Sequence, residues 1–417
     1  MTLIDYINDS PTSFHAVANS LQKLKESGYK EITEKEIWNL EWNQKYVLTR
    51  GDAALVAFYT GGESPTSGFH MAAAHTESPS LRIKTSSFKY QDNQLTATTD
   101  IYGGPIISSW LDRDLSVAGK ITALMNGEIL EGFINWAEPV GRVSNAPIHF
   151  NRNINKGKEY NPQTELLVSF GDATEEEFWN HIYQELSWSK EAKIIGTELY
   201  LYPSEKAQTI GVKADQIAAA RLDNLAMCYS LTESMLNLKS ASQISIIFLY
   251  DNEEVGSRTR RGADSAFTEQ ILRRIHNALK GSQEEYNVRI ANSFNLSADA
   301  AHGSNPNYSQ DFDPDYKPLL NKGPVIKVNT KQMYATTSYG FARYVQLCDQ
   351  ENVPYQQFII RSDKPCGSTI GPAASSLTGI ETVDIGLPLM SMHSIREVIS
   401  KLDLEYFQKV LNSFLHK

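Results

Sequence analysis

The chain has 417 residues, and its 49 Asp plus Glu outnumber its 39 Lys plus Arg, which gives a formal net charge of −10 at pH 7. This charge balance disfavours nucleic acid or an anionic membrane surface as the main partner. With 41% hydrophobic and 21% charged residues the composition excludes a disordered or fibrous chain, and the length predicts two or three domain-sized units.

The N-terminal segment MTLIDYINDSPTSFHAV carries an acid at Asp5 and no basic stretch before an apolar run, so we expect no secretory signal. Apolar runs elsewhere fall short of the roughly 18 residues of a membrane span. Cys228, Cys348 and Cys366 are far apart and lack a CxxC spacing, which argues against a disulfide framework or a thiolate zinc site. We therefore expect a cytoplasmic protein, in which any metal site is built from histidine and carboxylate.

Most of the chain alternates between helical patterns and short apolar strands. Apolar residues at i, i+3 and i+4 predict helices, and compact apolar runs that end in polar clusters predict buried strands. In chain order these are helix 12–27, strands 55–60 and 68–74, helix 224–238, strand 243–250 and helix 267–280. The alternation predicts a layered α/β/α domain with a mainly parallel sheet.

The middle of the chain has a different sequence pattern. Short alternating strands and turns run from about residue 84 to 209, with one helical pattern over 174–186. They predict a mostly β domain of residues 85–209 that is inserted into a discontinuous catalytic domain of residues 1–84 and 210–417. A Pro- and Asn-rich segment, 304–321, is the strongest loop signal.

Several potential metal ligands follow predicted strands or begin predicted helices. They are His75 in AAAHTESPS, Asp223 in ARLDNLA, Glu253 and Glu254 in LYDNEEVGS, Asp299 in LSADAAHGS, and His393 in MSMHSIRE. In open α/β sheets ligands bind beyond the carboxyl ends of the strands, so these side chains are expected to converge. Imidazoles and carboxylates without thiolate suit a pair of Zn²⁺, Mn²⁺ or Co²⁺ ions in a hydrolytic site.

The neighbouring pair Glu253 and Glu254 can divide two tasks, because adjacent side chains at a strand end point in different directions. One carboxylate can bind a metal while the other acts as a general base on water. Each feature also has an ordinary structural explanation: an acidic solvated turn for the pair, a hydrogen-bonded histidine for His75 or His393, and a helix N-cap for Asp223. The coincidence of all the segments favours the catalytic interpretation.

The sequence also resembles a known family. It contains, in order, HTESPSLRIK, YGGPIISSWLDRDLSVAG, ARLDNLA, LYDNEEVGS, SADAAHGSNPNY, KGPVIKVNTKQMYAT, PCGSTIGP and MHSIREV. Together these strings resemble the M18 metallopeptidases, the aspartyl aminopeptidases, over nearly the whole chain. The resemblance implies that Asp223 bridges two metal ions and that Glu253 is the general base. It implies that the remaining ligands are His75, Glu254, Asp299 and His393.

Four further residues match family positions that have other roles in the site. Glu77 stands where the family usually has Asp, and the resemblance implies that it orients the His75 imidazole; the alternative is a solvated loop acid. Lys327 and Tyr334 match the pocket for an acidic side chain, although Met333 replaces an arginine of many relatives and Lys327 alone resembles a surface lysine. His149 in PIHFNRNIN matches a histidine that enters a neighbouring subunit's site to bind the oxyanion, although a loop histidine is often only structural.

These observations predict a cytosolic metallo-aminopeptidase with two divalent ions per subunit, zinc being expected, that removes N-terminal Asp or Glu from short peptides. The family precedent implies a homo-oligomer, a dodecamer built from dimers. Two alternatives stay open: a related carboxypeptidase or deacylase with the same ligands, and a non-catalytic assembly protein on a peptidase scaffold.

Overall fold

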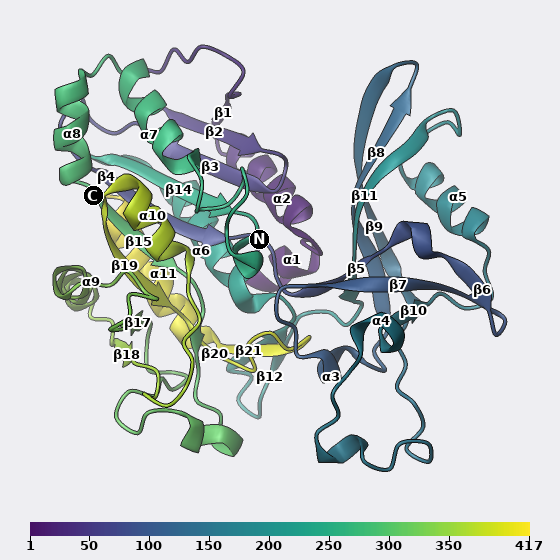
Figure 1. The fold of residues 1–417 in the computed structure, drawn as a ribbon. Coiled ribbons are helices and arrows are strands. Elements are labelled where there is room, and N and C mark those ends of the chain that lie inside the picture. Colours follow the sequence, from purple (N-terminus) through teal and green to yellow (C-terminus); the bar gives the residue numbers. More distant parts are fainter.

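The computed structural model describes residues 1–417 and contains two main sheets that lie side by side (Figure 1). The larger sheet has nine strands. From edge to edge they are β1 (Lys30–Glu31), β2 (Lys45–Arg50), β3 (Ala54–Tyr59), β14 (Ile244–Tyr250), β4 (Phe69–His75), β15 (Phe294–Ala298), β19 (Glu381–Gly386), β17 (Val325–Lys327) and β18 (Gln356–Phe358). The four central strands, from β14 to β19, are parallel, so their carboxyl ends meet at one edge.

Helices cover both faces of this sheet. One face carries α1 (Leu3–Asn8), α2 (Ser13–Glu26), α6 (Leu222–Asn237), α9 (Ser338–Gln350) and α11 (Lys401–Leu415). The other carries α7 (Phe267–Ala278), α8 (Gln283–Ala291) and α10 (Ile370–Thr378). Alternate strand residues enter opposite cores: Ala72 and Ala74 pack on the first face, Met71 and Ala73 on the second. The predicted layered α/β/α fold is confirmed.

The second main sheet is antiparallel and has seven strands. They are β5 (Ser80–Ile83), β6 (Lys89–Gln91), β7 (Gln94–Tyr102), β8 (Leu115–Met125), β9 (Glu128–Gly141), β10 (Leu167–Ser169) and β11 (Lys193–Pro203). Helix α5 (Glu175–Glu185) packs Phe178 and Ile182 into a separate hydrophobic core with this sheet. Short helical segments complete the unit: η1 (Thr85–Ser87), α3 (Ile107–Trp110), η2 (Ile154–Lys156) and α4 (Pro162–Glu165).

A small five-stranded sheet lies near the junction of the two units (Figure 1). Its order is β12 (Gln208–Ile210), β13 (Gln216–Ala219), β21 (Glu397–Ser400), β20 (Pro388–Met390) and β16 (Ala301–His302). The β13 strand leads into α6, and β20 leads into the turn that contains His393. The small sheet therefore couples two segments that carry candidate metal ligands.

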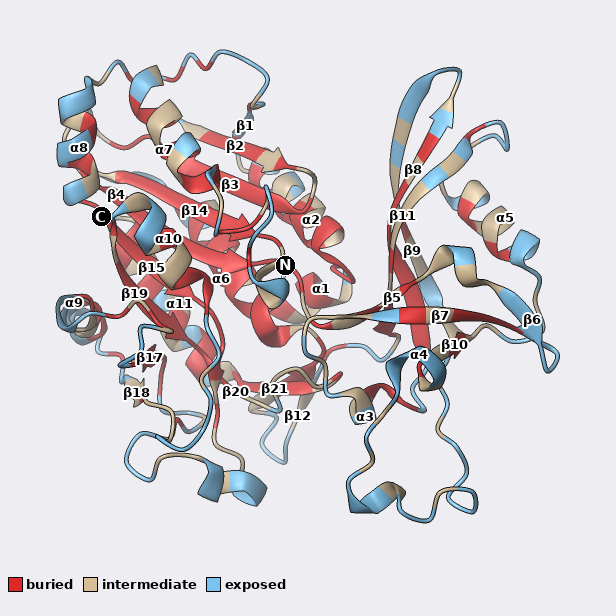
Figure 2. Cartoon of the chain, in the orientation of Figure 1, coloured by how far each residue is buried: buried red, intermediate tan, exposed pale blue.

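Burial follows this architecture. The central strands of the nine-stranded sheet are almost entirely buried, whereas the loops and outer strand ends of the second unit are largely exposed (Figure 2). None of the helices combines the length and apolar character that crossing a bilayer demands. The rigid parallel core thus holds the loops at its carboxyl edge.

Candidate metal centre

The candidate ligands come from separate elements that meet at the carboxyl edge of the parallel strands. His75 ends β4, and Asp299 directly follows β15. Glu253 and Glu254 lie in the short helix η3 (Glu253–Val255) just after β14. Asp223 lies in the first turn of α6, and His393 follows β20, so each segment delivers its side chain from a buried framework.

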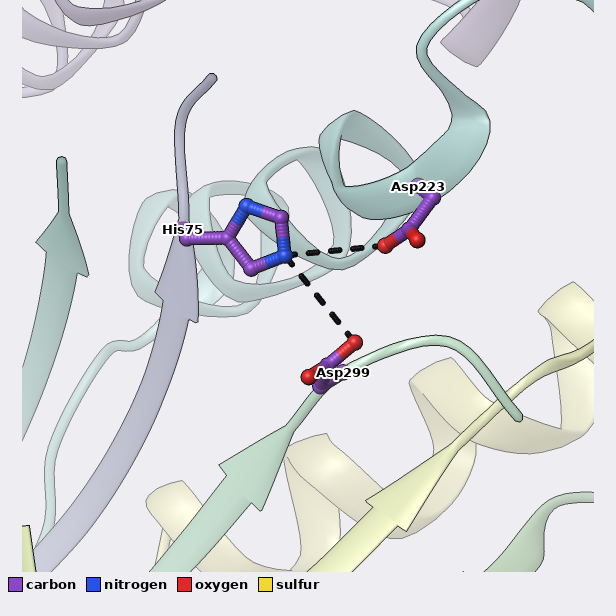
Figure 3. Close-up of side chains that lie close together, drawn as sticks. All are labelled: His75, Asp223 and Asp299. Carbon is purple, nitrogen blue, oxygen red and sulfur yellow. Dashed lines mark ion pairs between the residues drawn. The ribbon is translucent and has the colours of Figure 1, made fainter. Parts of the chain in front are cut away.

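A first group of donors surrounds His75. Its Nε2 atom lies 3.6 Å from Asp223 Oδ1 and 3.9 Å from Asp299 Oδ1 (Figure 3). All three side chains are at least nine-tenths buried. Donor atoms this close outline a position for one cation.

A second group surrounds His393. Its Nε2 atom lies 3.5 Å from Asp223 Oδ2 and 3.3 Å from Glu254 Oε1. Asp223 therefore faces one imidazole with each of its two oxygens. This is the geometry expected of a carboxylate between two cations, and it agrees with the bridging role that the sequence predicts for Asp223.

The donor set fits divalent cations, because several of the buried carboxylate oxygens have no hydrogen-bond partner. Asp223 Oδ1 and Glu254 Oε1 are buried and accept no hydrogen bond, and the same holds for Glu77 Oε2. An unpaired buried oxygen costs free energy, about 1–3 kcal/mol or more for a charged group. Bound cations would remove that cost for the two ligand oxygens, and the nitrogen and oxygen donors match zinc chemistry.

Burial and mutual repulsion shift the ionisation of the cluster. For the His393 imidazole burial lowers the pKa, but the Asp223 and Glu254 carboxylates outweigh it and raise the pKa to about 11. Burial raises the pKa of Asp299 to about 6. Burial, reinforced by the Asp299 charge, raises the pKa of Glu253 well above its usual range. The cluster thus holds excess negative charge that cations would neutralise.

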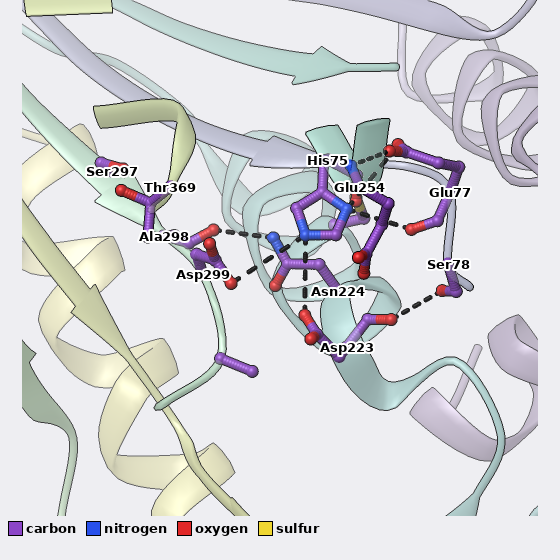
Figure 4. Close-up of polar contacts among 12 residues, drawn as sticks. His75, Glu77, Ser78, Asp223, Asn224, Glu254, Ser297, Ala298, Asp299 and Thr369 are labelled. Carbon is purple, nitrogen blue, oxygen red and sulfur yellow. Dashed lines mark hydrogen bonds and ion pairs between the residues drawn. The ribbon is translucent and has the colours of Figure 1, made fainter. Parts of the chain in front are cut away.

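Polar contacts behind the donors fix their orientation (Figure 4). Ser78 Oγ donates to the Asp223 carbonyl at 2.6 Å. Glu77 makes two kinds of contact: its backbone carbonyl lies 3.0 Å from His75 Nδ1, and its Oε1 accepts from the Glu254 backbone N–H at 2.9 Å. The Glu77 Oε2 atom lies farther from His75 Nδ1, at 3.7 Å. Glu77 therefore contacts two donors from different elements, His75 of β4 and Glu254 of η3.

Beside the donors a cleft contains the residues predicted to recognise substrate. Lys327 and Tyr334 both line it and are buried. Lys327 Nζ lies 3.7 Å from Asp299 Oδ2 and donates to the Ala300 carbonyl at 3.2 Å. His302 lines the same cleft, and burial lowers its pKa to about 4, so its imidazole is neutral near pH 7.

His149 lies elsewhere. It belongs to the exposed segment between β9 and η2, where its neighbours Ile148 and Phe150 are 52% and 85% exposed. Within one chain it does not line the cleft.

Sequence reasoning missed three residues that organise the site, of which Glu397 and Asp384 are buried and His302 is half-buried. Glu397 contacts the backbone of Asp223 and His393, Asp384 accepts hydrogen bonds from segments on the cleft wall, and His302 lines the cleft. Glu397 lies in the MHSIREV string, but its role depends on β13 and β21 pairing, which the string alone does not reveal.

Buried imidazole and carboxylate donors at the carboxyl edge of an α/β sheet define a hydrolytic metalloenzyme. The model of the family described as aminopeptidase I zinc metalloprotease (M18) matches residues 6–415, and the chain belongs to this family.

Individual relatives agree with this assignment. A probable M18 family aminopeptidase 2 from Pseudomonas savastanoi pv. phaseolicola is 40% identical over 99% of this chain and 96% of its own length. A solved complex of Ape4 with Nbr1 matches with a TM-score of 0.95 and 32% identity, over 99% of this chain and 84% of that one. The mApe1 dodecamer from S. cerevesiae matches with a TM-score of 0.86 and 25% identity, over 99% and 95% of the two chains.

Proposed function

We propose that this aminopeptidase uses two divalent ions per subunit and prefers peptides with N-terminal Asp or Glu. The observation that carries the proposal is the Asp223 carboxylate, whose oxygens face His75 at 3.6 Å and His393 at 3.5 Å. His75 and Asp299 complete one cation position, and Glu254 and His393 complete the other. Zinc is the expected ion, with manganese or cobalt as alternatives.

When bound, a pair of dications would polarise the scissile carbonyl and lower the pKa of water. Side chains of the protein accept and donate the protons. The Glu253 side chain accepts no hydrogen bond from the protein and lines the cleft, whereas Glu254 is held through Glu77 and faces His393. Glu253 is thus the carboxylate available to take a proton from the attacking water and return it to the leaving amine.

The acidic preference is supported by the charge in the cleft. Lys327 is buried there, its ammonium lies 5.3 Å from the centre of the Tyr334 ring, and the neighbouring His302 is neutral. A buried ammonium attracts a carboxylate far more strongly than a solvated one does. A substrate Asp or Glu side chain would therefore gain more binding free energy in the cleft than an apolar side chain.

The oxyanion donor is proposed to come from another subunit. His149 lies on the exposed loop between β9 and η2, together with the exposed apolar side chains of Ile148 and Phe150. Such apolar side chains beside a functional histidine fit a subunit contact. We infer a homo-oligomer, as in the mApe1 dodecamer, in which residues 85–209 form the dimerisation and lid domain.

Hydrolysis of a matched set of anilides tests this function. Apo protein reconstituted with Zn²⁺, Mn²⁺ or Co²⁺ is given Glu-, Asp-, Ala-, Leu- and Lys-anilides and N-acetyl-Glu-anilide. We expect the highest kcat/KM for Glu and Asp and no cleavage of the acetylated compound. A preference for the acetylated substrate would indicate a deacylase or another end specificity, and complete inactivity of metal-loaded protein would favour an assembly role.

A further inference from the structure

The Glu397 carboxylate connects two donors that lie far apart in the sequence. Its Oε2 accepts from the Asp223 backbone N–H at 3.0 Å, and its Oε1 accepts from the His393 backbone N–H at 2.7 Å. Glu397 is only 2% exposed. It begins β21 and pairs with Ala219 in β13, four positions before Asp223, so the small sheet places it between the two segments.

Both Glu397 oxygens act as acceptors in these contacts. A backbone N–H can donate but cannot accept, so each Glu397 oxygen must act as an acceptor. An amide at this position would turn its NH₂ toward one of these N–H groups. That change leaves a buried donor unpaired.

The His393 turn needs such a restraint. His393 has φ 67°, in the left-handed region that residues other than glycine seldom adopt. Backbone conformations of this kind persist when surrounding contacts determine them. The His393 carbonyl accepts from the Ile106 N–H at 2.9 Å, its Nδ1 lies 3.0 Å from the Gly104 carbonyl, and Glu397 holds its N–H.

We propose that Glu397 is a positioning residue that fixes Asp223 and His393 at the spacing needed by the cation between Asp223 Oδ2 and His393 Nε2. The inference rests on the proposed function, because it takes both residues as metal ligands. His393 belongs only to the group with Asp223 and Glu254, whereas Asp223 belongs to that group and to the group with His75 and Asp299. Loss of the Glu397 carboxylate should therefore weaken the ion at His393 more than the ion at His75.

The chain offers a matched control. Asp403 is also fully buried and also accepts two backbone N–H groups, from Gly323 and Asn321, each at 2.7 Å. It lies in α11 and is not among the candidate metal donors. Glu397→Gln and Asp403→Asn therefore make the same chemical change, once at the site and once away from it.

Zn²⁺ titration of the apo proteins in competition with a chromophoric chelator measures the effect, with thermal unfolding of each apo form recorded alongside. In Glu397→Gln one of the two Zn²⁺ affinities should fall roughly ten- to a hundredfold, the range typical of groups that orient metal ligands. Asp403→Asn should lower the thermal midpoint and leave both affinities at the wild-type value. Wild-type affinities in Glu397→Gln, or an equal loss in Asp403→Asn, would overturn the proposal.

Glu397→Asp provides a second test should Glu397→Gln fail to fold. Aspartate keeps the carboxylate, but its side chain is one methylene shorter. It can therefore reach the N–H of either Asp223 or His393 well and the other poorly. We expect the same Zn²⁺ step to weaken, and unchanged affinities would overturn the positioning role. Wild-type protein separates the two proposals: if it binds fewer than two ions the proposed function fails, whereas two ions bound with wild-type affinities in every variant refute only the role of Glu397.

Discussion

At the scale of single residues, two neighbouring glutamates have different surroundings. The Glu254 backbone N–H donates to Glu77 Oε1 at 2.9 Å, and Glu254 Oε1 lies 3.3 Å from His393 Nε2. The Glu253 side chain lines the cleft without a hydrogen-bond donor from the protein. Adjacent positions in one short helix thus supply one carboxylate beside the His393 imidazole and one that lines the cleft without a donor.

This difference predicts opposite effects of two isosteric substitutions. Glu253→Gln should retain two metal ions per subunit and lose most turnover, because it removes the proton acceptor but no ligand. Glu254→Gln should lose metal as well as turnover. Metal analysis of the purified proteins together with kcat decides the assignment, and metal loss confined to Glu253→Gln would reverse it.

Glu77 allows a graded test. The Glu77 carboxylate accepts from the Glu254 backbone N–H and lies 3.7 Å from His75 Nδ1. Its removal in Glu77→Ala, which keeps the backbone carbonyl beside His75, should reduce metal affinity or activity roughly ten- to a hundredfold. Glu77→Asp should keep most of both, since the shorter acid stands at this position in much of the family. If Glu77→Ala behaves as wild type in a Zn²⁺ titration and in the anilide assay, Glu77 has no part in orienting the donors.

At the scale of elements, Asp384 in β19 joins three segments around the cleft. Its Oδ1 accepts from Ser297 Oγ and from Thr369 Oγ1, both at 2.6 Å, and its Oδ2 accepts from the Ala335 N–H at 2.6 Å. A Cβ added at Gly371 would come within 2.3 Å of Asp384 Oδ2. The glycine at the start of α10 therefore makes room for the carboxylate.

Removal of the Asp384 carboxylate should cost stability. Asp384→Ala leaves the Ala335 N–H and two hydroxyls without their acceptor, and each unpaired buried group costs about 1–3 kcal/mol. Asp384→Asn should be much milder, because its amide oxygen can accept from Ala335 while the hydroxyls of Ser297 and Thr369 rotate to accept from its NH₂. Urea unfolding of the apo proteins compares the two, and equal losses would contradict this hydrogen-bond account.

Much of this arrangement could be predicted from local sequence. The apolar runs before HTESPS and DNEEVGS indicated buried strands, and β4 and β14 end at those motifs. The contacts of Glu397 and Asp384 could not be predicted, because each joins segments brought together only by strand pairing. The proposed contact of the His149 loop with a partner subunit could not be predicted either, because it depends on how the surfaces of two subunits meet.

At the scale of the whole molecule, several buried or half-buried histidines are neutral near pH 7. Burial lowers the pKa of His15, His70 and His302 to about 4 in each case. His70 lies in β4, and its Nδ1 is 3.0 Å from the Phe414 carbonyl of α11. Protonation of such residues favours the unfolded chain, whose histidines titrate near pH 6.5.

The folded state should therefore lose stability as the pH falls from about 6.5 toward 4, because the unfolded state binds more protons in that window. His70→Gln should flatten this dependence by up to about 1.4 kcal/mol per pH unit, equivalent to one proton. Urea unfolding of apo protein in a chelator between pH 7 and pH 4.5 measures it. An unchanged slope in His70→Gln would show that His70 does not titrate on unfolding in that window.

The proposed entry of His149 into a partner's site predicts complementation between subunits. His149→Ala should bind metal normally but lose about a hundred- to a thousandfold in turnover, the usual cost of removing one oxyanion donor. Mixing it with Glu253→Gln under conditions that exchange subunits should restore activity, because some sites then combine an intact Glu253 with an intact His149. Full activity of His149→Ala alone, or no recovery despite proven exchange, would rule out a shared site.

The most direct test of the account follows turnover while metal is added back. Apo protein is titrated with Zn²⁺, and the initial rate of Glu-anilide hydrolysis is measured at each ratio of ion to subunit. The position of Asp223 between His75 and His393 predicts two cation sites. The rate should therefore rise to a plateau at two ions per subunit, and apo protein should be inactive. A plateau at one ion, or full activity in apo protein freed of metal, would contradict the dinuclear aminopeptidase.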